Sequence, residues 1–232
     1  MGIHGPEYEL IARTIPGDHA RTSSAEDMVA EALARCGADA PRVLDLGCGD
    51  GRGLDLIRAL APGADYTGCD IEVSPEVASR TREDGRFVSY SGTDLPFADD
   101  SFDIVYSRQV FEHVRHPDRV VAEIARVLKS GGIFAGSLSN LEPYHSFSIF
   151  NYTPYGLFRI VEDNGLVLDA MRPGIEGMAL IARQLSMRTI GRLPLAYPLF
   201  AVAAKLKGWD ARTQNYAKLR FSGHICFLAR KG

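Results

Sequence analysis

Short apolar runs alternate with amphipathic stretches along most of the chain. The apolar runs predict strands, because a continuous run suits a sheet that is covered on both faces. They lie at 43–46, 66–71, 86–90, 102–107, 133–138, 166–170 and 226–229. Helical patterns separate most of these runs, so the order of the elements predicts an α/β domain with a mainly parallel sheet.

Local signals set the limits of the predicted helices. Ser23 and Glu26 form a capping-box pattern, which predicts a helix that begins there and runs to about Cys36. A stripe of apolar residues predicts another helix over 117–129, ended by a pair of glycines. Thr153, which is followed by proline, is expected to cap a third helix.

The strand at 43–46 runs into a turn in which Gly47, Gly49 and Gly51 alternate with other residues. Glycine permits positive φ and lets a ligand approach the backbone. A helix follows, and helix N-termini favour electron-rich or anionic groups. The dinucleotide fingerprint would need a further glycine at position 52 or 54, where the chain has Arg and Leu. The turn therefore favours another nucleotide-type ligand, and a tight turn without any ligand is the alternative.

Asp70 ends the next predicted strand, about twenty residues beyond the glycine turn. In a doubly wound sheet this position places a carboxylate beside the turn, where it can accept hydrogen bonds from two ribose hydroxyls. A helix-capping or solvated Asp is the alternative. The ribose role indicates a nucleoside but does not distinguish between nucleosides.

From Val43 to about Ser137 the chain resembles class I S-adenosylmethionine (SAM) dependent methyltransferases of the type 11 small-molecule group. Four blocks match in order and spacing: the Asp-x-Gly-x-Gly-x-Gly turn, Asp70, the block at 94–103 and the block at 127–132. Between the last two, Val-Phe-Glu-His-Val is similar to the family's LEHV segment. The resemblance implies a Rossmann-like, doubly wound, mainly parallel seven-stranded sheet with strand seven antiparallel between strands five and six. About fifty residues separate the last two predicted strands, which predicts a helical insertion.

The resemblance also implies which residues hold the sugar and methionine parts of SAM. Asp45, Gly47 and Gly49 would hold the methionine moiety, and Cys48 lies between the glycines in the same turn. Asp70 would bind the ribose. These residues form the first part of the expected cofactor site.

The adenine side of the expected site departs from the family in one position. Ile71 would flank the adenine, and Gly92 and Thr93 would offer backbone groups to its edge. The family often has Asp at the position of Ser91, and a hydroxyl accepts a hydrogen bond more weakly than a carboxylate. Adenine recognition is therefore expected to depend on the backbone, or on Asp94 if the loop shifts.

Ser107 and Arg108 follow the fourth strand, and the resemblance implies that they line the methionine side. Two alternatives remain for Arg108. It could steer an anionic acceptor, or it could form an ion pair with a carboxylate of the protein.

Two histidines are the candidates for catalysis. Methyl transfer from a sulfonium is an in-line displacement, and a hydroxyl acceptor needs a general base. His113, after the fourth strand, and His145, after the fifth, have the right pKa range for this role. A capping or packing role for His113 and an exposed loop position for His145 are the alternatives. His113-x-x-His116 with Glu112 has a spacing that could bind metal, but we predict no metal site because such pairs in turns seldom form one.

Composition excludes several classes of function. The 232 residues are 46% hydrophobic and 24% charged, and the net charge of −3 argues against nucleic acid as a partner. The four cysteines form no C-x-x-C pair, so we expect reduced thiols and a cytoplasmic protein. No apolar run is long enough for a transmembrane helix.

The expected organisation is one domain over 1–232. A helical cap would occupy 1–40, the SAM-binding core 41–138 and the insertion 176–222. Helices in the place of the cap commonly cover the sheet edge in the resembled family. Residues 1–22 look irregular, and they are expected to be either a lid or a frayed terminus.

The insertion is expected to form amphipathic helices over the acceptor site. Met178, Leu180, Ile181 and Leu185 form one apolar set, and Leu195, Leu199, Val202 and Leu206 form another. A lid, a structural cap, a homodimer contact and a membrane-surface helix remain as alternatives.

The predicted function is methyl transfer from SAM to a small molecule, most simply at a hydroxyl oxygen. Sugars, polyketides, quinones and lipid-linked molecules remain open as acceptors. A non-catalytic SAM-binding protein, an RNA methyltransferase and a nicotinamide oxidoreductase are the alternatives. The glycine spacing disfavours the last of these, and the net charge disfavours RNA.

Overall fold

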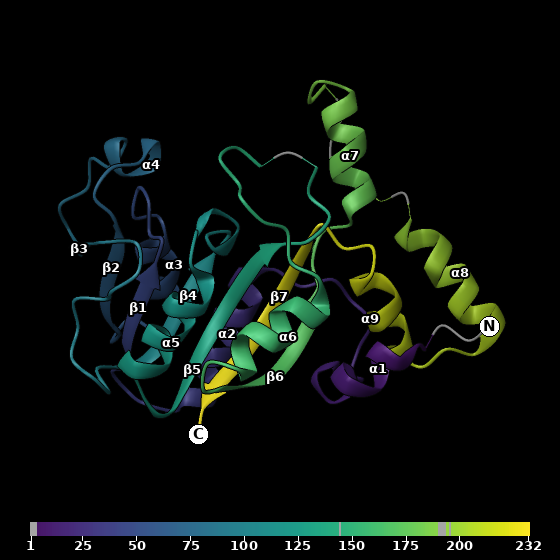
Figure 1. Ribbon diagram of the computed structural model, residues 1–232, viewed down its shortest axis with the longest axis horizontal. Helices are drawn as coiled ribbons and strands as arrows, with labels where there is room; N and C mark the ends of the chain where they lie inside the picture. The colour runs from purple at the N-terminus through teal and green to yellow at the C-terminus, as the bar shows by residue number, and fades with distance from the viewer. Residues whose placement is uncertain (1–3, 144, 190–193, 195) are drawn as a thin grey trace.

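The computed structural model describes residues 4–143, 145–189, 194 and 196–232. Its centre is a seven-stranded sheet in the order β3-β2-β1-β4-β5-β7-β6 (Figure 1). The strands are β1 (Arg42–Leu46), β2 (Asp65–Ile71), β3 (Arg86–Tyr90), β4 (Phe102–Arg108), β5 (Leu128–Ser139), β6 (Leu166–Pro173) and β7 (His224–Lys231). Strand β7 is antiparallel to both β5 and β6, which confirms the predicted Rossmann-like class I fold.

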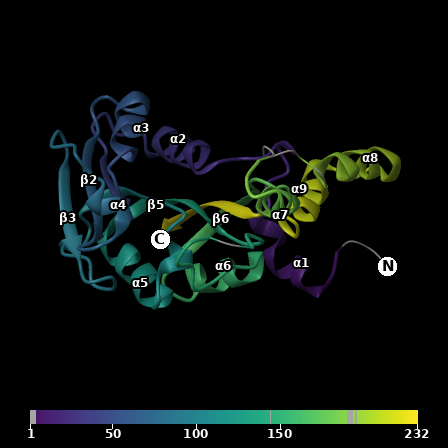
Figure 2. The ribbon, with the colours of Figure 1, turned by 90° about the horizontal axis from the view of Figure 1, so that it is seen from above.

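Helices cover both faces of this sheet (Figure 2). They are α1 (Pro6–Ile11), η1 (Ala12–Thr14), α2 (Ala25–Cys36), α3 (Gly53–Leu60), α4 (Pro75–Ala78), η2 (Phe111–His113), α5 (Pro117–Val127), α6 (Pro154–Glu162), α7 (Gly177–Leu185), α8 (Tyr197–Lys207) and α9 (Ala211–Leu219). One apolar cluster packs α2 and α3 on one face, and a second packs α5 and α6 on the other. Two buried layers therefore hold the strand ends in fixed positions, which is what a site at the sheet edge requires.

Helix α2 begins one residue later than the sequence predicts. Ser24, not Ser23, accepts from the amide of Asp27, and the Asp27 carboxylate accepts in return from the amide of Ser24. The helix ends at Gly37, which has φ +65° as expected for this position. It covers the face of β4, β5 and β7 rather than the sheet edge. Its buried residues pack in one apolar cluster with residues of these strands.

The prediction of an irregular N-terminal segment is wrong for residues 6–14, which form α1 and η1, whereas residues 15–22 lie outside helices and strands as expected. Ile11 and Ile15 are fully buried among the residues of the second apolar cluster. Arg172 of β6 forms a 2.8 Å ion pair with Asp18, and Arg13 forms a 2.7 Å pair with Glu162. The helices of this segment were not predicted because they are short and the sequence around them contains the turn signals Gly and Pro. The ion pairs that hold the segment join it to residues distant in sequence.

One predicted helix end is also wrong. Helix α5 stops at Val127, and Leu128 begins β5, so the strand includes the glycines that we expected to end the helix. The five apolar residues of the predicted stripe are nevertheless all buried. The apolar pattern is therefore a better guide to the buried face than to the end of the element.

The described part of the insertion forms helices α7, α8 and α9, but their buried faces differ from the predicted stripes. On α7, Leu180 is 5% exposed while Leu185 is 81% exposed. Glu176 is buried, and its carboxylate accepts from the amides of Ala196 and Tyr197, which holds the start of α8. Helix α9 packs on β6, and Leu195 lies outside the described residues.

Candidate functional site

A cavity of about 1700 Å³ lies outside the carboxyl ends of the parallel strands. The glycine turn and Asp70 line it, and so do His113 and His145. Helices α7 and α8 also contribute to its wall, with Ala179 and Tyr197 among the lining residues. The cavity therefore brings together most of the residues that the sequence singled out.

The glycine turn has the backbone conformation that its sequence predicts. Gly47, Gly49 and Gly51 have φ of +76°, +51° and +85°. A Cβ atom on Gly47 would lie 2.2 Å from the side chain of Val110, so no larger residue fits. The amide of Gly47 donates to the carbonyl of Cys69 at 2.7 Å, which ties the turn to the end of β2. Cys48 lines the cavity, and burial raises the pKa of its thiol.

Asp70 lies at the boundary between this turn and the next loop. Its carboxylate accepts from the amides of Gly49 and Ile71, each at 2.7 Å. Burial raises the pKa of Asp70, and the two amide bonds oppose that rise. Each carboxylate oxygen keeps accepting capacity on the cavity side, so the residue fits a vicinal diol such as ribose.

Asp45 is a buried carboxyl at the end of β1 and also lines the cavity. It is 4% exposed, and the hydroxyl of Tyr66 donates to its Oδ2 at 2.7 Å. Burial raises the pKa of Asp45 to about 7. A Cβ atom on Gly53 would lie 2.1 Å from Oδ2, so the first residue of α3 must be glycine to leave room for the carboxyl. A cationic ammonium is the ligand group that would best compensate this site.

Tyr106 is a cavity residue that the sequence reasoning missed. It pairs with Asp45 in the register of β1 and β4, and it lines the cavity. Its side chain is 2% exposed, and its hydroxyl has no hydrogen-bond partner among the described residues. Ser107, which we expected on the methionine side, is buried and does not line the cavity. The alternation of side chains along β4 is the signal that could have identified Tyr106. Tyr106 lies beside Asp45 on the neighbouring strand, and the next residue, Ser107, points to the opposite face of the sheet.

The expected adenine side is formed by two stretches, the end of β2 and the loop after β3. Ile71 is 39% exposed and lines the cavity together with Gly92 and Thr93. Asp94 does not line the cavity. Its Oδ2 accepts instead from the hydroxyls of Ser91, at 3.2 Å, and Thr93, at 2.8 Å. Asp94 therefore orders the loop in which Ser91 replaces the family's usual Asp.

Arg108 forms a 2.7 Å ion pair with Glu26 of α2, and both residues line the cavity. Pairing with a carboxylate of the protein was one of the two alternatives for this side chain. Gln109, the next residue, has φ +54° and donates from Nε2 to the hydroxyl of Ser137 at 3.0 Å. These two contacts attach the end of β4 and the loop after it to α2 and to β5.

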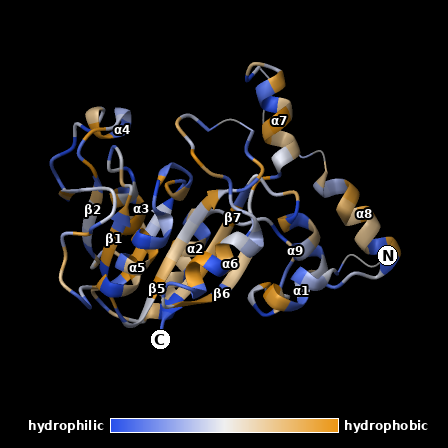
Figure 3. Ribbon diagram, in the orientation of Figure 1, coloured by the Kyte–Doolittle hydropathy of each residue, from blue (hydrophilic) through white to orange (hydrophobic). Residues whose placement is uncertain are grey.

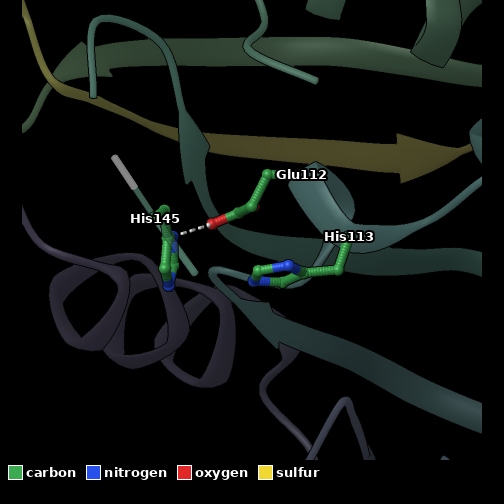
Figure 4. Close-up of side chains that lie close together, drawn as sticks. All are labelled: Glu112, His113 and His145. Carbon is green, nitrogen blue, oxygen red and sulfur yellow. Dashed lines mark ion pairs between the residues drawn. The ribbon is translucent and has the colours of Figure 1, made fainter. Parts of the chain in front are cut away.

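The two candidate bases lie against each other (Figure 4), and both line the cavity. The ring centroids of His113 and His145 are 4.8 Å apart, with the rings nearly perpendicular. His145 Nδ1 lies 3.1 Å from Oε1 of Glu112, whose side chain is fully buried. The hydrogen bond with Glu112 raises the pKa of His145. The arrangement orients one imidazole while its other nitrogen stays available for proton transfer.

A second carboxylate and a third histidine extend this cluster. Glu142 Oε2 lies 3.5 Å from His145 Nδ1 and 3.0 Å from Nε2 of His224, the first residue of β7. His224 lowers the pKa of Glu142, against the effect of burial. The hydroxyl of Ser139 lies 3.0 Å from both Glu112 and Glu142. Sequence reasoning did not identify Glu112 as the partner of His145, and it missed Glu142 and His224 altogether. The loop after β5 and strand β7 bring these residues together over long separations in the sequence.

Glu112, His113 and His145 each offer one ligand atom, and these atoms lie within 4.8 Å of one another. Two imidazoles and a carboxylate are a donor set that divalent metals accept. The existing 3.1 Å ion pair already satisfies His145 and one oxygen of Glu112 without a metal. His116, which the sequence spacing paired with His113, is exposed and outside this group. The prediction of no metal stays a prediction.

Comparison with known proteins finds a family match for the stretch that contains the glycine turn, Asp70 and His113. A family model described as a methyltransferase domain matches residues 44–136. A probable S-adenosylmethionine-dependent methyltransferase of Mycolicibacterium smegmatis is 36% identical over 152 residues, or 58% of this chain and 56% of the relative. The phthiotriol/phenolphthiotriol dimycocerosates methyltransferase of Mycobacterium tuberculosis is 39% identical over 97 residues, or 40% of this chain and 36% of the relative.

The solved structures agree on the fold. A methyltransferase of Haloferax volcanii, in complex with the Trm112 methyltransferase activator, superposes with a TM-score of 0.58 at 24% identity, and the match covers 88% of each chain. The chain contains a class I SAM-dependent methyltransferase domain.

The methyltransferase domain matched by the family model ends before β6 and the insertion. The chain spans 36% to 56% of the length of the curated relatives it matches. Within the domain, the residues that line the cavity fit SAM on three counts. Asp45 is a buried carboxyl that forms no ion pair among the described residues, the hydroxyl of Tyr106 has no hydrogen-bond partner among them, and the glycine turn lines the cavity with backbone at positive φ.

Proposed function

We propose that the protein transfers a methyl group from SAM to a hydroxyl oxygen of a small acceptor that has an apolar part. The observation that carries the proposal is one continuous cavity, which the glycine turn, Asp45 and Asp70 line together with His113 and His145; the part lined by the two histidines is here called its acceptor end. A binding protein without catalysis would have no need for an oriented histidine in this cavity.

Each residue has a role in this proposal. SAM supplies an electrophilic methyl group on a sulfonium. Asp70 would accept from the ribose hydroxyls, and Asp45 would face the ammonium of the methionine moiety. His113 or His145 would take the proton of the acceptor hydroxyl, and Glu112 would orient His145 and stabilise its charged form. The buried site would exclude water and align the acceptor with the methyl group.

The cavity has an apolar rim. Val73 and Phe147 line the cavity and are each 82% exposed, while Ile175 and Ala179 line it from the side of the insertion. This mixture of histidines, carboxylates and apolar residues supports an acceptor with one reactive polar group on a hydrophobic body. The name of the M. tuberculosis relative, a phthiotriol dimycocerosates methyltransferase, also supports a lipid-linked acceptor.

The proposal is tested with the purified full chain and methyl-deuterated SAM. Mass spectrometry would follow transfer to hydroxyl-bearing polyketides, quinones, glycolipids and short RNA. We expect a mass shift in an apolar hydroxyl acceptor and none in RNA. The His113→Ala/His145→Ala variant, with SAM binding retained, is the control. SAM binding with no transfer to any acceptor would favour the non-catalytic alternative, and absence of SAM binding would overturn the proposal.

A further inference from the structure

Helix α8 has an apolar stripe on its outer face. Leu199, Val202 and Leu206 are 70%, 59% and 81% exposed. They are spaced by three and four residues, so they lie on one side of the helix. Tyr197 and Ala204 are buried and share the opposite side. The helix therefore turns its apolar stripe, here called the α8 stripe, away from the protein.

Two lysines accompany the α8 stripe. Lys205 and Lys207 are exposed, and their positions in the helix place one on each side of the stripe. Trp209 follows, and Lys207 Nζ lies 5.8 Å from the centroid of its ring. An apolar stripe flanked by cations, with Trp at its end, is the arrangement of helices that lie in a membrane interface.

The charge of the chain is divided unevenly. Residues 176–222 contain eight Lys or Arg and two acidic residues, whereas the rest of the chain contains 18 basic and 27 acidic residues. Of the two acidic residues, Glu176 is buried and Asp210 caps α9. The insertion is thus a basic region on an otherwise acidic protein, and an anionic surface would attract it while repelling the remainder.

The end of α7 also exposes apolar residues next to a basic one. Leu185 is 81% exposed and Met187 is 88% exposed, with Arg188 exposed next to them. Figure 3 shows α8 mainly in hydrophobic colours on the outside of the molecule. No helix in the described part of the chain is long and apolar enough to cross a membrane.

We propose that the α8 stripe, with Lys205 and Lys207, docks on the surface of an anionic phospholipid bilayer. The occupant is a lipid surface rather than a second copy, because α8 contains lysines but no acidic residue, so a second α8 would add like charge to the contact, whereas anionic headgroups would compensate the lysines. Tyr197 of α8 lines the cavity, so docking would hold the acceptor end beside the bilayer. In this respect the inference rests on the proposed function and specifies a lipid-borne acceptor, whereas the docking itself needs no methyl transfer.

The test is co-sedimentation of the full chain with vesicles. Vesicles of phosphatidylcholine alone are compared with vesicles that contain phosphatidylglycerol in addition. We expect binding that is at least about tenfold stronger with phosphatidylglycerol and that weakens with salt. Leu199→Gln/Val202→Gln/Leu206→Gln and, separately, Lys205→Glu/Lys207→Glu should each weaken it at least about tenfold.

Matched controls change the same residue types elsewhere. Leu10→Gln/Leu60→Gln alters exposed apolar residues, and Arg86→Glu/Arg119→Glu alters exposed basic residues, outside the insertion. Both should bind vesicles as the unaltered protein does. Equal binding to both vesicle types, or full binding by either α8 variant, would overturn the proposal. A dimer that the triple variant abolishes, without vesicle binding, would show that a second copy covers the stripe and would also overturn it.

Calorimetry with SAM separates this proposal from the proposed function. The α8 variants should bind SAM as the unaltered protein does, because the α8 stripe faces away from the cavity. Vesicle binding by a protein that does not bind SAM would retain the docking and remove the proposed function. SAM binding and methyl transfer without vesicle binding would remove the docking alone.

Discussion

The carboxylate of Asp70 accepts a 2.7 Å hydrogen bond from the amide of Gly49. This bond joins the end of β2 to the turn after β1, across a separation of 21 residues. Two motifs that are distinct in the sequence therefore form one wall of the cavity. The turn is held by the same side chain that is proposed to bind the ribose.

Replacing Asp70 should weaken SAM binding without unfolding the protein. Asp70→Ala removes the proposed ribose acceptor and leaves the amide of Gly49 without its partner, so we expect an affinity about 10- to 100-fold lower. Calorimetry measures this directly. Asp65→Ala, at the exposed opposite end of β2, is the control and should bind SAM normally. Unchanged affinity in Asp70→Ala would show that this carboxylate only holds the turn.

The hydroxyl of Tyr106 should contribute to ligand binding and not to stability. Tyr106→Phe removes a buried hydroxyl that has no partner, so the melting temperature should stay the same or rise, while SAM affinity falls about three- to tenfold. Tyr152→Phe is the matched control, because the hydroxyl of Tyr152 donates to the carbonyl of Phe111 at 3.0 Å. It should lower the melting temperature and leave SAM affinity unchanged. The reverse pattern would remove Tyr106 from the site.

Asp45 should release a proton when SAM binds. Burial raises its pKa from the ordinary 3.8 to about 7 in the ligand-free protein, and a bound ammonium would lower it again. SAM affinity should therefore increase as the pH rises from about 6 to about 8. Calorimetry in buffers of different ionisation enthalpy measures the released proton. Identical heats in such buffers at pH 7 would contradict the prediction.

The same carboxyl should control the pH dependence of stability. Because the folded protein holds this proton more tightly than the unfolded chain, ligand-free stability should fall as the pH rises from about 4 to about 7. Asp45→Asn has no proton to lose, so at pH 8 it should unfold about 5 °C higher than the unaltered protein. Thermal unfolding between pH 5 and pH 8 tests this expectation.

Turnover should depend on at least one of the two paired histidines. If His145 is the base, His145→Ala should lower kcat about 100-fold or more with little change in SAM affinity, and His113→Ala should change kcat less. The opposite ranking would assign the base to His113. His19→Ala, outside the cavity, is the control. Activity within a few-fold of normal in both variants would mean that catalysis consists mainly of positioning.

Glu112 should set the protonation of His145. The hydrogen bond raises the pKa of His145, so Glu112→Gln should lower it, and a histidine titration by NMR would show the change. This pair contributes stability that is fully present below pH 6.5 and is lost as the pH rises through the pKa of folded His145. Glu112→Gln should remove that loss. An unaltered His145 titration would show that the pair does not form in solution.

The sheet and the cofactor end of the site could be predicted because their signals are local. Apolar runs marked all seven strands, and the glycines after β1 have the positive φ that their spacing indicated. The place of strand seven between strands five and six came from the resemblance, not from the runs themselves. It was harder to infer which side chains of β4 face the cavity, because an error of one residue in the alternation exchanges Tyr106 for Ser107.

The acceptor end could not be predicted in the same way. Glu142 and His224 are 82 residues apart, and only the place of β7 between β5 and β6 brings them within 3.0 Å. The packed N-terminal segment was missed for a similar reason, since Asp18 finds its partner Arg172 at a separation of 154 residues. Patterns within a window of ten or twenty residues contain no information about such contacts.

The place of β7 also has a consequence for biosynthesis. Strands β5 and β6 are each paired with β7 and not with each other, and three helices emerge from the ribosome between β6 and β7. During translation both strands therefore keep an unpaired backbone edge until β7 follows. Unpaired edges are the usual starting point of aggregation, so the nascent chain passes through a stage at which chaperones have a surface to protect.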